Sequence, residues 1–355
     1  MVTFKLATLR SCTTVTLDIL KDCVLKIPWY RWLPRKKSRQ GRPPYPREQL
    51  LWGLFLQIRE HLSNEEELVR KLTENSAYRR FCSFSKRRIP SHDTFKRFYD
   101  SLSVKRLESM FRHLDDKLDQ LGVFRPDELA LDATDLLTNG RNQHHPDLEA
   151  GYGHKSDKER FHGYWAYFVV GTKSELPRLI DVAPANIHQS IIGQDLLAKI
   201  DTIDKHGATI MLFDAAYDDK KTYTKVIELE MIPCVSYNPR KSNIRSFSQL
   251  STKNWRKRSL GAEGIKIRRS TRKLRLSVER YQATFKHLLQ GRVLPKQGLT
   301  NAKKYVYLTA ILSQLNALVN YHQKVKHLVL KPQSLLNYFA VNTTSSHGGV
   351  VGAST

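Results

Sequence analysis

The spacing of apolar residues changes near Pro126. Before this point apolar residues recur at intervals of three and four, the spacing of helices that bury one face. Polar residues that cap helices stand at two of the expected helix starts. The predicted helices begin near Pro46, Ser63, Pro90 and Val104. Residues 46–125 are therefore predicted to form a small, basic, all-helical domain.

Short runs of apolar, β-branched and aromatic residues follow Pro126, and helical stretches separate the later runs. The predicted strands are 129–131, 164–170, 179–182, 210–213 and 232–235, and the predicted helices are 191–200, 221–229 and 301–327. Strands in close succession, followed by strands that alternate with helices, are typical of a mixed sheet covered by helices. We therefore predict an α/β domain over residues 126–328, with residues 144–162 in a loop between the first two strands.

The two ends of the chain lack such patterns. Residues 29–47 contain seven basic residues, no acid and four prolines, and the prolines prevent a continuous helix. Residues 1–45 are predicted to be a basic N-terminal arm, in which Arg35, Lys36 and Lys37 are candidate DNA contacts. Residues 329–355 are predicted to be a C-terminal tail with a disordered end.

Charge is the most unusual property of the composition. The 355 residues carry a formal charge of +25, from 59 Lys and Arg against 34 Asp and Glu. Such a field favours a polyanion, and nucleic acid is the better candidate because the longest apolar stretches are too short or too polar to span a bilayer. No membrane partner is expected. Asp18 and Asp22 stand where a signal peptide needs an apolar stretch, so we expect a cytoplasmic, nucleoid-associated protein.

The sequence argues against two other kinds of site. Its four cysteines are scattered without a Cys-x-x-Cys pair, and its histidines form no His-Glu-x-x-His motif, so neither zinc nor a disulfide framework is expected. It contains no glycine-rich loop that ends in Gly-Lys-Ser or Gly-Lys-Thr, so ATP use is not expected.

Three carboxylates stand out among the few acids. Asp132 and Asp214 each close an apolar run, which predicts that both lie at the carboxyl ends of strands, where open sheets collect ligands. Taken alone, either residue fits a structural role equally well, because polar residues commonly end strands. Glu279 lies in a strongly basic stretch. Oxygen-only ligands suit Mg²⁺, and a pair of Mg²⁺ ions suits phosphodiester chemistry.

The helix that is predicted around Glu279 has two distinct faces. At about 100° per residue, Arg272, Arg275, Glu279 and Lys286 share one stripe, while apolar residues occupy the opposite side. The apolar residues are Leu274, Val278, Tyr281, Phe285, Leu288 and Leu289. The simpler interpretation is a solvated face with an ordinary Arg275–Glu279 pair. Because two strand-end Asp residues accompany this helix, we favour a site.

These residues carry a resemblance to a known family. The spacing of Arg275, Glu279 and Lys286 resembles the Tyr-x2-Arg-x3-Glu-x6-Lys signature of insertion-sequence DDE transposases. Asp132 in Leu-Asp-Ala-Thr-Asp and Asp214 in Phe-Asp-Ala-Ala-Tyr-Asp resemble the contexts of that family's two Asp residues. The similarity covers about residues 40–325. It departs from the family at two positions, where Arg272 replaces the Tyr and Gln189 replaces a frequent Asp.

The resemblance implies an RNase H-like catalytic core and a two-metal reaction that cuts and joins DNA. Asp132, Asp214 and Glu279 would be catalytic and would hold two Mg²⁺ ions, with Mn²⁺ as the alternative metal. Arg275, Lys286 and Arg272 would contact DNA. The implied partners are double-stranded DNA, namely the terminal inverted repeats of its own element and a target. A homodimer is expected because two DNA ends must be held together.

Other questions stay open at this level. The helix after Pro90 presents Lys96 and Arg97 as candidate DNA contacts, but a helix-turn-helix and an ordinary helical bundle share its pattern. Two alternatives to a transposase also remain. One is a DNA-binding regulator that is derived from a transposase and no longer cuts, and the other is an RNase H-like endonuclease that cuts without joining.

Overall fold

The computed structural model describes residues 27–34, 43–124, 128–138, 147–155, 159–200, 207–239, 243–288 and 293–322. Arg35, Lys36, Lys37 and the predicted tail lie outside these ranges. The chain divides into two compact units, one of residues 1–114 and 311–355 and the other of residues 115–310. No helix among the described residues is both long enough and apolar enough to cross a membrane.

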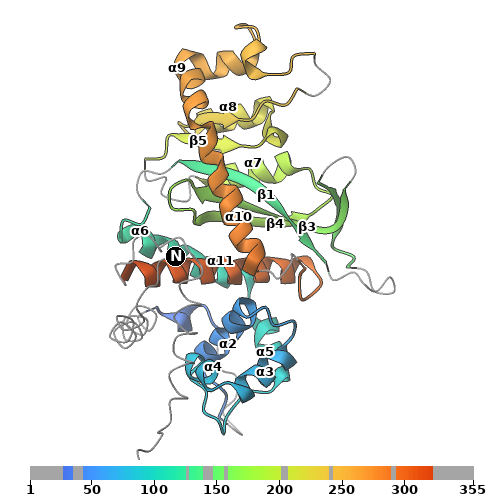
Figure 1. Cartoon of the computed structure of the whole chain (residues 1–355), viewed down its shortest axis with the longest axis vertical. Helices are drawn as coiled ribbons and strands as arrows, with labels where there is room; N and C mark the ends of the chain where they lie inside the picture. The colour runs from blue at the N-terminus through green and yellow to red at the C-terminus, as the bar shows by residue number, and fades with distance from the viewer. Residues whose placement is uncertain are drawn as a thin grey trace, which may run out of the picture. The chain divides into compact units, whose positions relative to one another are not determined.

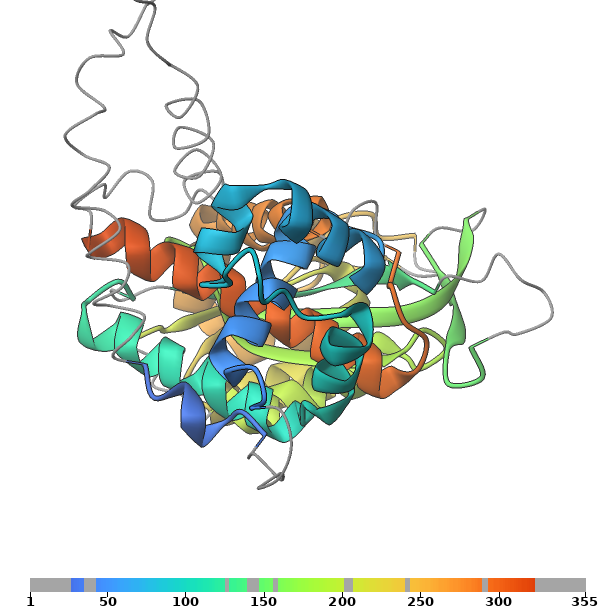
Figure 2. The ribbon, with the colours of Figure 1, turned by 90° about the horizontal axis from the view of Figure 1, so that it is seen from below.

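The first unit contains the helices that the N-terminal pattern predicts. They are α2 (Arg47–Arg59), α3 (Glu65–Glu74), α5 (His92–Ser101) and the start of α6 (Val104–Gln120), joined by a short α4 (Ser76–Phe81) and preceded by the 3-10 turn η2 (Trp29–Arg31). Figures 1 and 2 show α2 to α5 grouped together in blue. The polar start that was predicted for α3 is confirmed, since the Asn64 side chain accepts a hydrogen bond from the Glu67 backbone at 2.8 Å.

The second unit is built on a mixed sheet, as predicted, and this sheet has six strands. Its strands are β1 (Leu129–Leu137), β2 (Gly151–His154), β3 (Arg160–Gly171), β4 (Pro177–Pro184), β5 (Ile210–Phe213) and β6 (Ile232–Val235). The order is β2-β3-β1-β5-β6, and β4 also pairs with β3. The pairs of β1 with β3, β2 with β3 and β3 with β4 are antiparallel, whereas β1 with β5 and β5 with β6 are parallel.

One prediction within this sheet is wrong. Residues 144–162 were expected to form a loop, but residues 151–154 form β2 and residues 160–162 begin β3. The pattern missed β2 because it is short and has glycine at its buried positions, Gly151 and Gly153. A Cβ atom at Gly153 would lie 2.6 Å from the Phe161 ring, so the strand pairing itself demands glycine there.

Helices cover both faces of the sheet (Figure 1). On one face, α7 (Gln189–Lys199) and α8 (Lys220–Glu228) pack against alternate residues of the central strands, including Leu131, Tyr167 and Val169. The C-terminal part of the unit consists of α9 (Trp255–Thr271), the 3-10 turn η6 (Arg272–Arg275), α10 (Leu276–Leu288) and the first part of α11 (Leu299–His322). Short 3-10 turns, η4 (Ala215–Tyr217) and η5 (Phe247–Gln249), follow β5 and precede α9.

Aromatic contacts hold α10 on the opposite face of the sheet. The Phe168 ring of β3 lies 5.1 Å from Tyr281 and 4.8 Å from Phe285, centroid to centroid, and all three side chains are buried. Val278 is also buried, which confirms the predicted apolar face. Leu274 is an exception because it is 36% exposed. It lies in η6, where the tighter 3-10 geometry rotates side chains off the α-helical stripe.

This packing predicts that Phe285→Ala destabilises the protein by about 3–5 kcal/mol, since it removes a fully buried ring and leaves a cavity under α10. The free energy of unfolding from urea titration measures the effect. Leu276→Ala on the same helix is the matched control, because Leu276 is 48% exposed and its loss should cost no more than about 0.5 kcal/mol. Equal midpoints for wild type and Phe285→Ala would contradict the assigned packing.

Candidate active site

The register of the sheet brings Asp132 and Asp214 to adjacent positions. Parallel pairing of β1 with β5 ends at Leu131 and Phe213, and the two acids are the next residues in each chain segment. The prediction that Asp132 ends its strand is wrong, since β1 continues to Leu137. The continuation is paired with β3, whereas β5 stops. Asp132 therefore lies beside the carboxyl end of β5 without being at the end of its own strand.

Glu279 approaches the same place from α10. Asp132 pairs with Phe168, so both side chains point to the face of the sheet that α10 covers. Arg275 connects the two carboxylates, because its Nη1 lies 3.4 Å from Asp132 Oδ2 and its Nη2 donates to Glu279 Oε1 at 2.6 Å. The ordinary Arg275–Glu279 pair is thus present, but Arg275 also reaches across to the sheet.

The environment of Asp132 favours its protonated form. Burial, together with the negative charges of Asp214 and Glu279, raises the pKa of Asp132 to about 6 from the ordinary 3.8. A backbone hydrogen bond from Ala133 and the charge of Arg275 act in the opposite direction. Mutual repulsion among carboxylates at one place is the electrostatic condition that a bound cation relieves.

The donor set fits a hard divalent cation, since all three side chains offer carboxylate oxygens. They do not form a closed cluster, however. Within the ranges that the structure describes, no group of three His, Cys, Asp or Glu side chains is arranged to hold a metal ion. Asp132, Asp214 and Glu279 therefore share a neighbourhood and a favourable charge balance, and metal binding would require rotation of their side chains.

Lys286 has a partner that the sequence did not suggest. Its Nζ donates to Asp135 Oδ1 at 3.0 Å, and Lys155 Nζ lies 3.0 Å from Asp135 Oδ2. Burial raises the pKa of Asp135, but the hydrogen bonds from the two lysines outweigh it and lower the pKa overall. No sequence signal identified Lys155, because β2 brings it to β1 only through the shared neighbour β3.

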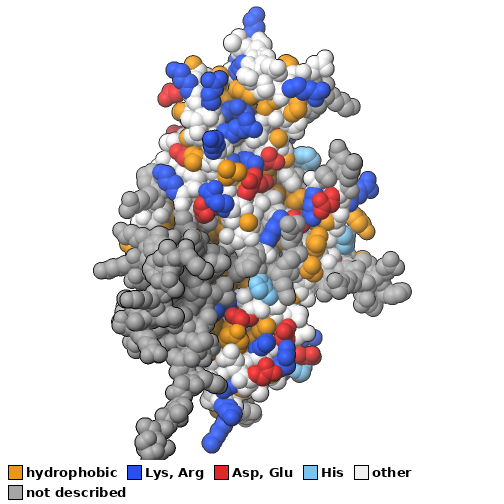
Figure 3. All heavy atoms as spheres, viewed as in Figure 1, with side chains coloured by type: hydrophobic (Ala, Val, Ile, Leu, Met, Phe, Trp, Pro, Cys, Tyr) orange, Lys and Arg blue, Asp and Glu red, His pale blue; other side chains and the backbone are white. Residues whose placement is uncertain are grey.

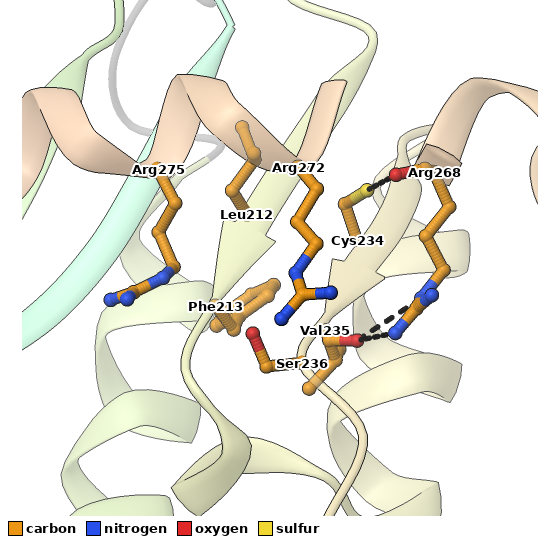
Figure 4. A pocket seen from close by; sticks show the side chains of 8 residues that line it. All are labelled: Leu212, Phe213, Cys234, Val235, Ser236, Arg268, Arg272 and Arg275. Atoms are coloured by element: carbon orange, nitrogen blue, oxygen red, sulfur yellow. Dashed lines mark hydrogen bonds between the residues drawn. The ribbon is translucent and has the colours of Figure 1, made fainter. Parts of the chain in front are cut away.

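Arg272 lies in a different environment from Glu279. Figure 4 shows Arg268, Arg272 and Arg275 extending from the α9–η6 segment toward the ends of β5 and β6, with the Arg272 guanidinium between the other two. They line a hollow that also includes Ser236. Arg268 and Ser236 were missed as individual candidates, and only the strongly basic stretch around Glu279 pointed to this region.

Basic side chains also gather over α9 and η6 on the surface. Arg258, Lys266, Arg269, Arg272 and Lys273 are exposed there. Figure 3 shows Lys and Arg side chains concentrated over this part of the molecule. In the first unit, Lys96 and Arg97 are exposed on α5, while Phe95 and Phe98 of the same helix are buried. Both surfaces are suited to a polyanion.

Comparison with known families identifies the protein class. A family model described as "Transposase DDE domain" matches residues 124–315, which is more than half of the chain. The chain belongs to this DDE transposase family. A second model, described as "Transposase domain (DUF772)", matches residues 18–101. No curated protein and no solved structure matches the chain.

Membership of the DDE transposase family confirms the resemblance that the motifs suggested. The mixed sheet with helices on both faces is consistent with the RNase H-like fold of this family. Membership of this family supports a transposase function, and the family implies DNA binding and dependence on a divalent metal. The match extends through Asp132, Asp214 and Glu279, which all lie within residues 124–315.

The raised pKa of Asp132 predicts a pH dependence of stability. The carboxyl loses its proton near pH 4 in the unfolded chain and near pH 6 in the folded protein, so the folded state binds more protons between these values. Its contribution to stability therefore falls as pH rises from about 4 to about 6. We expect the free energy of unfolding of Asp132→Asn, relative to wild type, to rise over this interval by at most about 3 kcal/mol.

Urea titrations at several pH values, in buffer with a metal chelator, measure this difference. Asp135→Asn serves as a control of opposite sign. The pKa of Asp135 is lowered in the folded protein, so this carboxylate stabilises the fold at pH values above its pKa in the unfolded chain. That stabilisation is lost as pH falls through the lowered pKa. A difference between Asp132→Asn and wild type that does not change with pH would show that Asp132 is not crowded by the other acids.

Proposed function

We propose that this transposase cuts and joins the ends of its element by two-metal phosphodiester chemistry, with Asp132, Asp214 and Glu279 as the catalytic carboxylates. The observation that supports this most strongly is the contact of Arg275 with both Asp132 and Glu279, at 3.4 and 2.6 Å, beside the end of β5 that Asp214 follows. Asp132 lies on β1, Asp214 directly follows β5 and Glu279 lies on α10, and the three acids share one neighbourhood in a chain of charge +25.

Each acid has a distinct position in the proposed site. Asp132 is more enclosed than Glu279, with a side chain 17% exposed, and the Ala133 backbone donates to its Oδ1 at 2.8 Å. This hydrogen bond fixes the orientation of the carboxylate. Glu279 is 43% exposed and projects from a helix that is anchored by its aromatic face. An enclosed ligand and a more mobile one suit a site that must admit a DNA strand.

Asp132 and Asp214 would hold two Mg²⁺ ions, or Mn²⁺ in their place, and Glu279 would complete the ligand shell of one of them. When bound, such ions lower the pKa of an attacking water or 3′-hydroxyl and stabilise the leaving oxygen. Arg275 now contacts both Asp132 and Glu279, so a cation that takes these carboxylates would free its guanidinium for a DNA phosphate.

Lys286 would act on DNA through its position beside Asp135. The Asp135 carboxylate pairs with Lys286 and Lys155, and Lys155 also pairs with Glu159, so two cations face two carboxylates. We infer that Lys286 contacts the backbone of the bound strand, and that Asp135 limits how far Lys286 can move.

The catalytic assignment predicts the behaviour of three conservative variants. Asp132→Asn, Asp214→Asn and Glu279→Gln should each lose at least about 100-fold in Mg²⁺-dependent nicking of a duplex that carries the inverted repeat bordering the gene, because each removes a charged metal ligand. Binding of the duplex should persist. Glu263→Gln is the matched control, since Glu263 is an exposed acid of α9. Undiminished nicking by any of the three would remove that residue from the site.

The same assay separates the alternatives. A DNA-binding regulator would bind the duplex without nicking it in the wild-type protein, whereas an endonuclease would nick it without joining the released 3′ end to a second DNA. Strand transfer into a target plasmid supports the transposition reaction. We further propose that a homodimer holds the two ends, which crosslinking of the protein on paired ends would detect.

We infer that α5 contributes to DNA binding through Lys96 and Arg97. Their joint replacement by Ala should make the slope of log affinity against log salt concentration less steep by about 1.8, since each lost phosphate contact removes about 0.9. Fluorescence anisotropy with a labelled duplex measures the slope. Lys105→Ala with Arg106→Ala removes two exposed cations from α6 as the control. Equal changes in both double variants would argue against a specific role for α5.

A further inference from the structure

The hollow beside β5 and β6 concentrates positive charge without an acid in its lining. Arg268, Arg272 and Arg275 approach it from the α9–η6 segment, and Ser236 follows β6 on the other side. The remaining lining residues belong to β5 and β6 and are apolar or, in one case, a thiol. Such a hollow is electrostatically unfavourable unless an anion enters it.

One of these arginines is already held rigidly. Arg268 donates from Nε and Nη2 to the Val235 carbonyl oxygen, at 3.2 and 2.9 Å, and its guanidinium lies 3.9 Å from the centre of the Phe247 ring. Burial lowers its pKa, and the charge of Arg272 adds to this effect. The two guanidinium groups therefore repel each other across the hollow.

Arg272 is placed to receive the anion. Its side chain is exposed, and no hydrogen bond or ion pair joins its guanidinium to any other described residue, whereas the guanidinium groups of Arg268 and Arg275 have partners. The Ser236 backbone is fixed, because its N–H donates to the Phe213 carbonyl at 3.1 Å. A rigid guanidinium, an available guanidinium and a hydroxyl then face one space, and all of them are donors.

We propose that Arg268, Arg272 and Ser236 form a subsite for one backbone phosphate of a DNA strand, next to the scissile phosphate. A guanidinium binds phosphate oxygens through two parallel hydrogen bonds, which a carboxylate-free hollow permits. The subsite adjoins the catalytic acids, since Phe213 directly precedes Asp214 and Arg275 contacts Asp132. The assignment rests on the proposed function, because it places a neighbouring phosphate of the strand that is cut or joined.

A phosphate-replacement experiment tests the subsite. The full-length protein is titrated, without divalent metal, against element-end duplexes in which one phosphate at a time is a neutral methylphosphonate. Binding by the wild type should fall at least about tenfold at one position beside the scissile phosphate, since a charge-assisted hydrogen-bond pair is lost. Arg272→Ala should bind the unmodified duplex with a similar loss and show no further loss at that position.

Two control variants distinguish a contact with one phosphate from nonspecific electrostatic binding of DNA. Lys273→Ala removes an exposed cation from the next residue of η6, which does not line the hollow, and should keep the position-dependent loss. Arg272→Lys keeps the charge without the two-pronged geometry and should restore only part of the affinity. If Arg272→Ala weakens binding equally for every modified duplex, or not at all, the subsite is wrong.

A second series with methylphosphonates in the target duplex identifies the source of the phosphate. If the loss of binding at one modified position disappears in Arg272→Ala in the first series, the subsite binds the element end. If this happens in the second series, the subsite binds the target. The failure of the proposed function would look different. In that case the wild type would not nick the unmodified duplex with Mg²⁺, whatever the binding data show for Arg272.

Discussion

Parallel pairing between β1 and β5 stops at Leu131 and Phe213, and the arrangement of the site depends on this register. Because side chains alternate between the faces of a sheet, a shift by one residue would turn Asp132 toward the core that α7 and α8 cover. The fully buried Leu131 and Phe213 oppose such a shift, since a slip of β1 would remove Leu131 from that core and a slip of β5 would remove Phe213. Apolar burial on one face thus determines where a carboxylate lies on the other.

The second requirement is the position of α10. Its aromatic face contacts Phe168, the residue that pairs with Asp132 in β3, so one strand carries both the anchor for the helix and the neighbour of the acid. Glu279 reaches the site because this packing places the first turn of α10 over β1. The other side of α10 is exposed and can carry charged side chains. Arg275 is the last residue of η6, immediately before α10 begins.

Cations balance the site at several points without neutralising it. Arg275 bridges Asp132 and Glu279, and two lysines share Asp135. The hollow lined by Arg268 and Arg272 adds positive charge with no acid in its lining. A partly buried acid, whose pKa is raised by burial and by neighbouring carboxylates, therefore lies close to these cations. This combination attracts a phosphodiester strand and favours a divalent cation at the point where the strand would react.

The sequence by itself determined the helical start of the chain, most strands of the sheet, the apolar face of α10 and the acids that form the candidate site. The helices, the strands and the apolar face follow from local periodicity and from capping, which act within a few residues, whereas the acids were selected because their sequence contexts resemble those of a known family. The sequence did not reveal β2, the length of β1 beyond Asp132 or the 3-10 turn at Arg272. It also did not reveal the contacts of Asp132 with Arg275 or of Asp135 with Lys155. Tertiary structure decided these, because strand pairing and helix packing bring together residues that no local pattern connects.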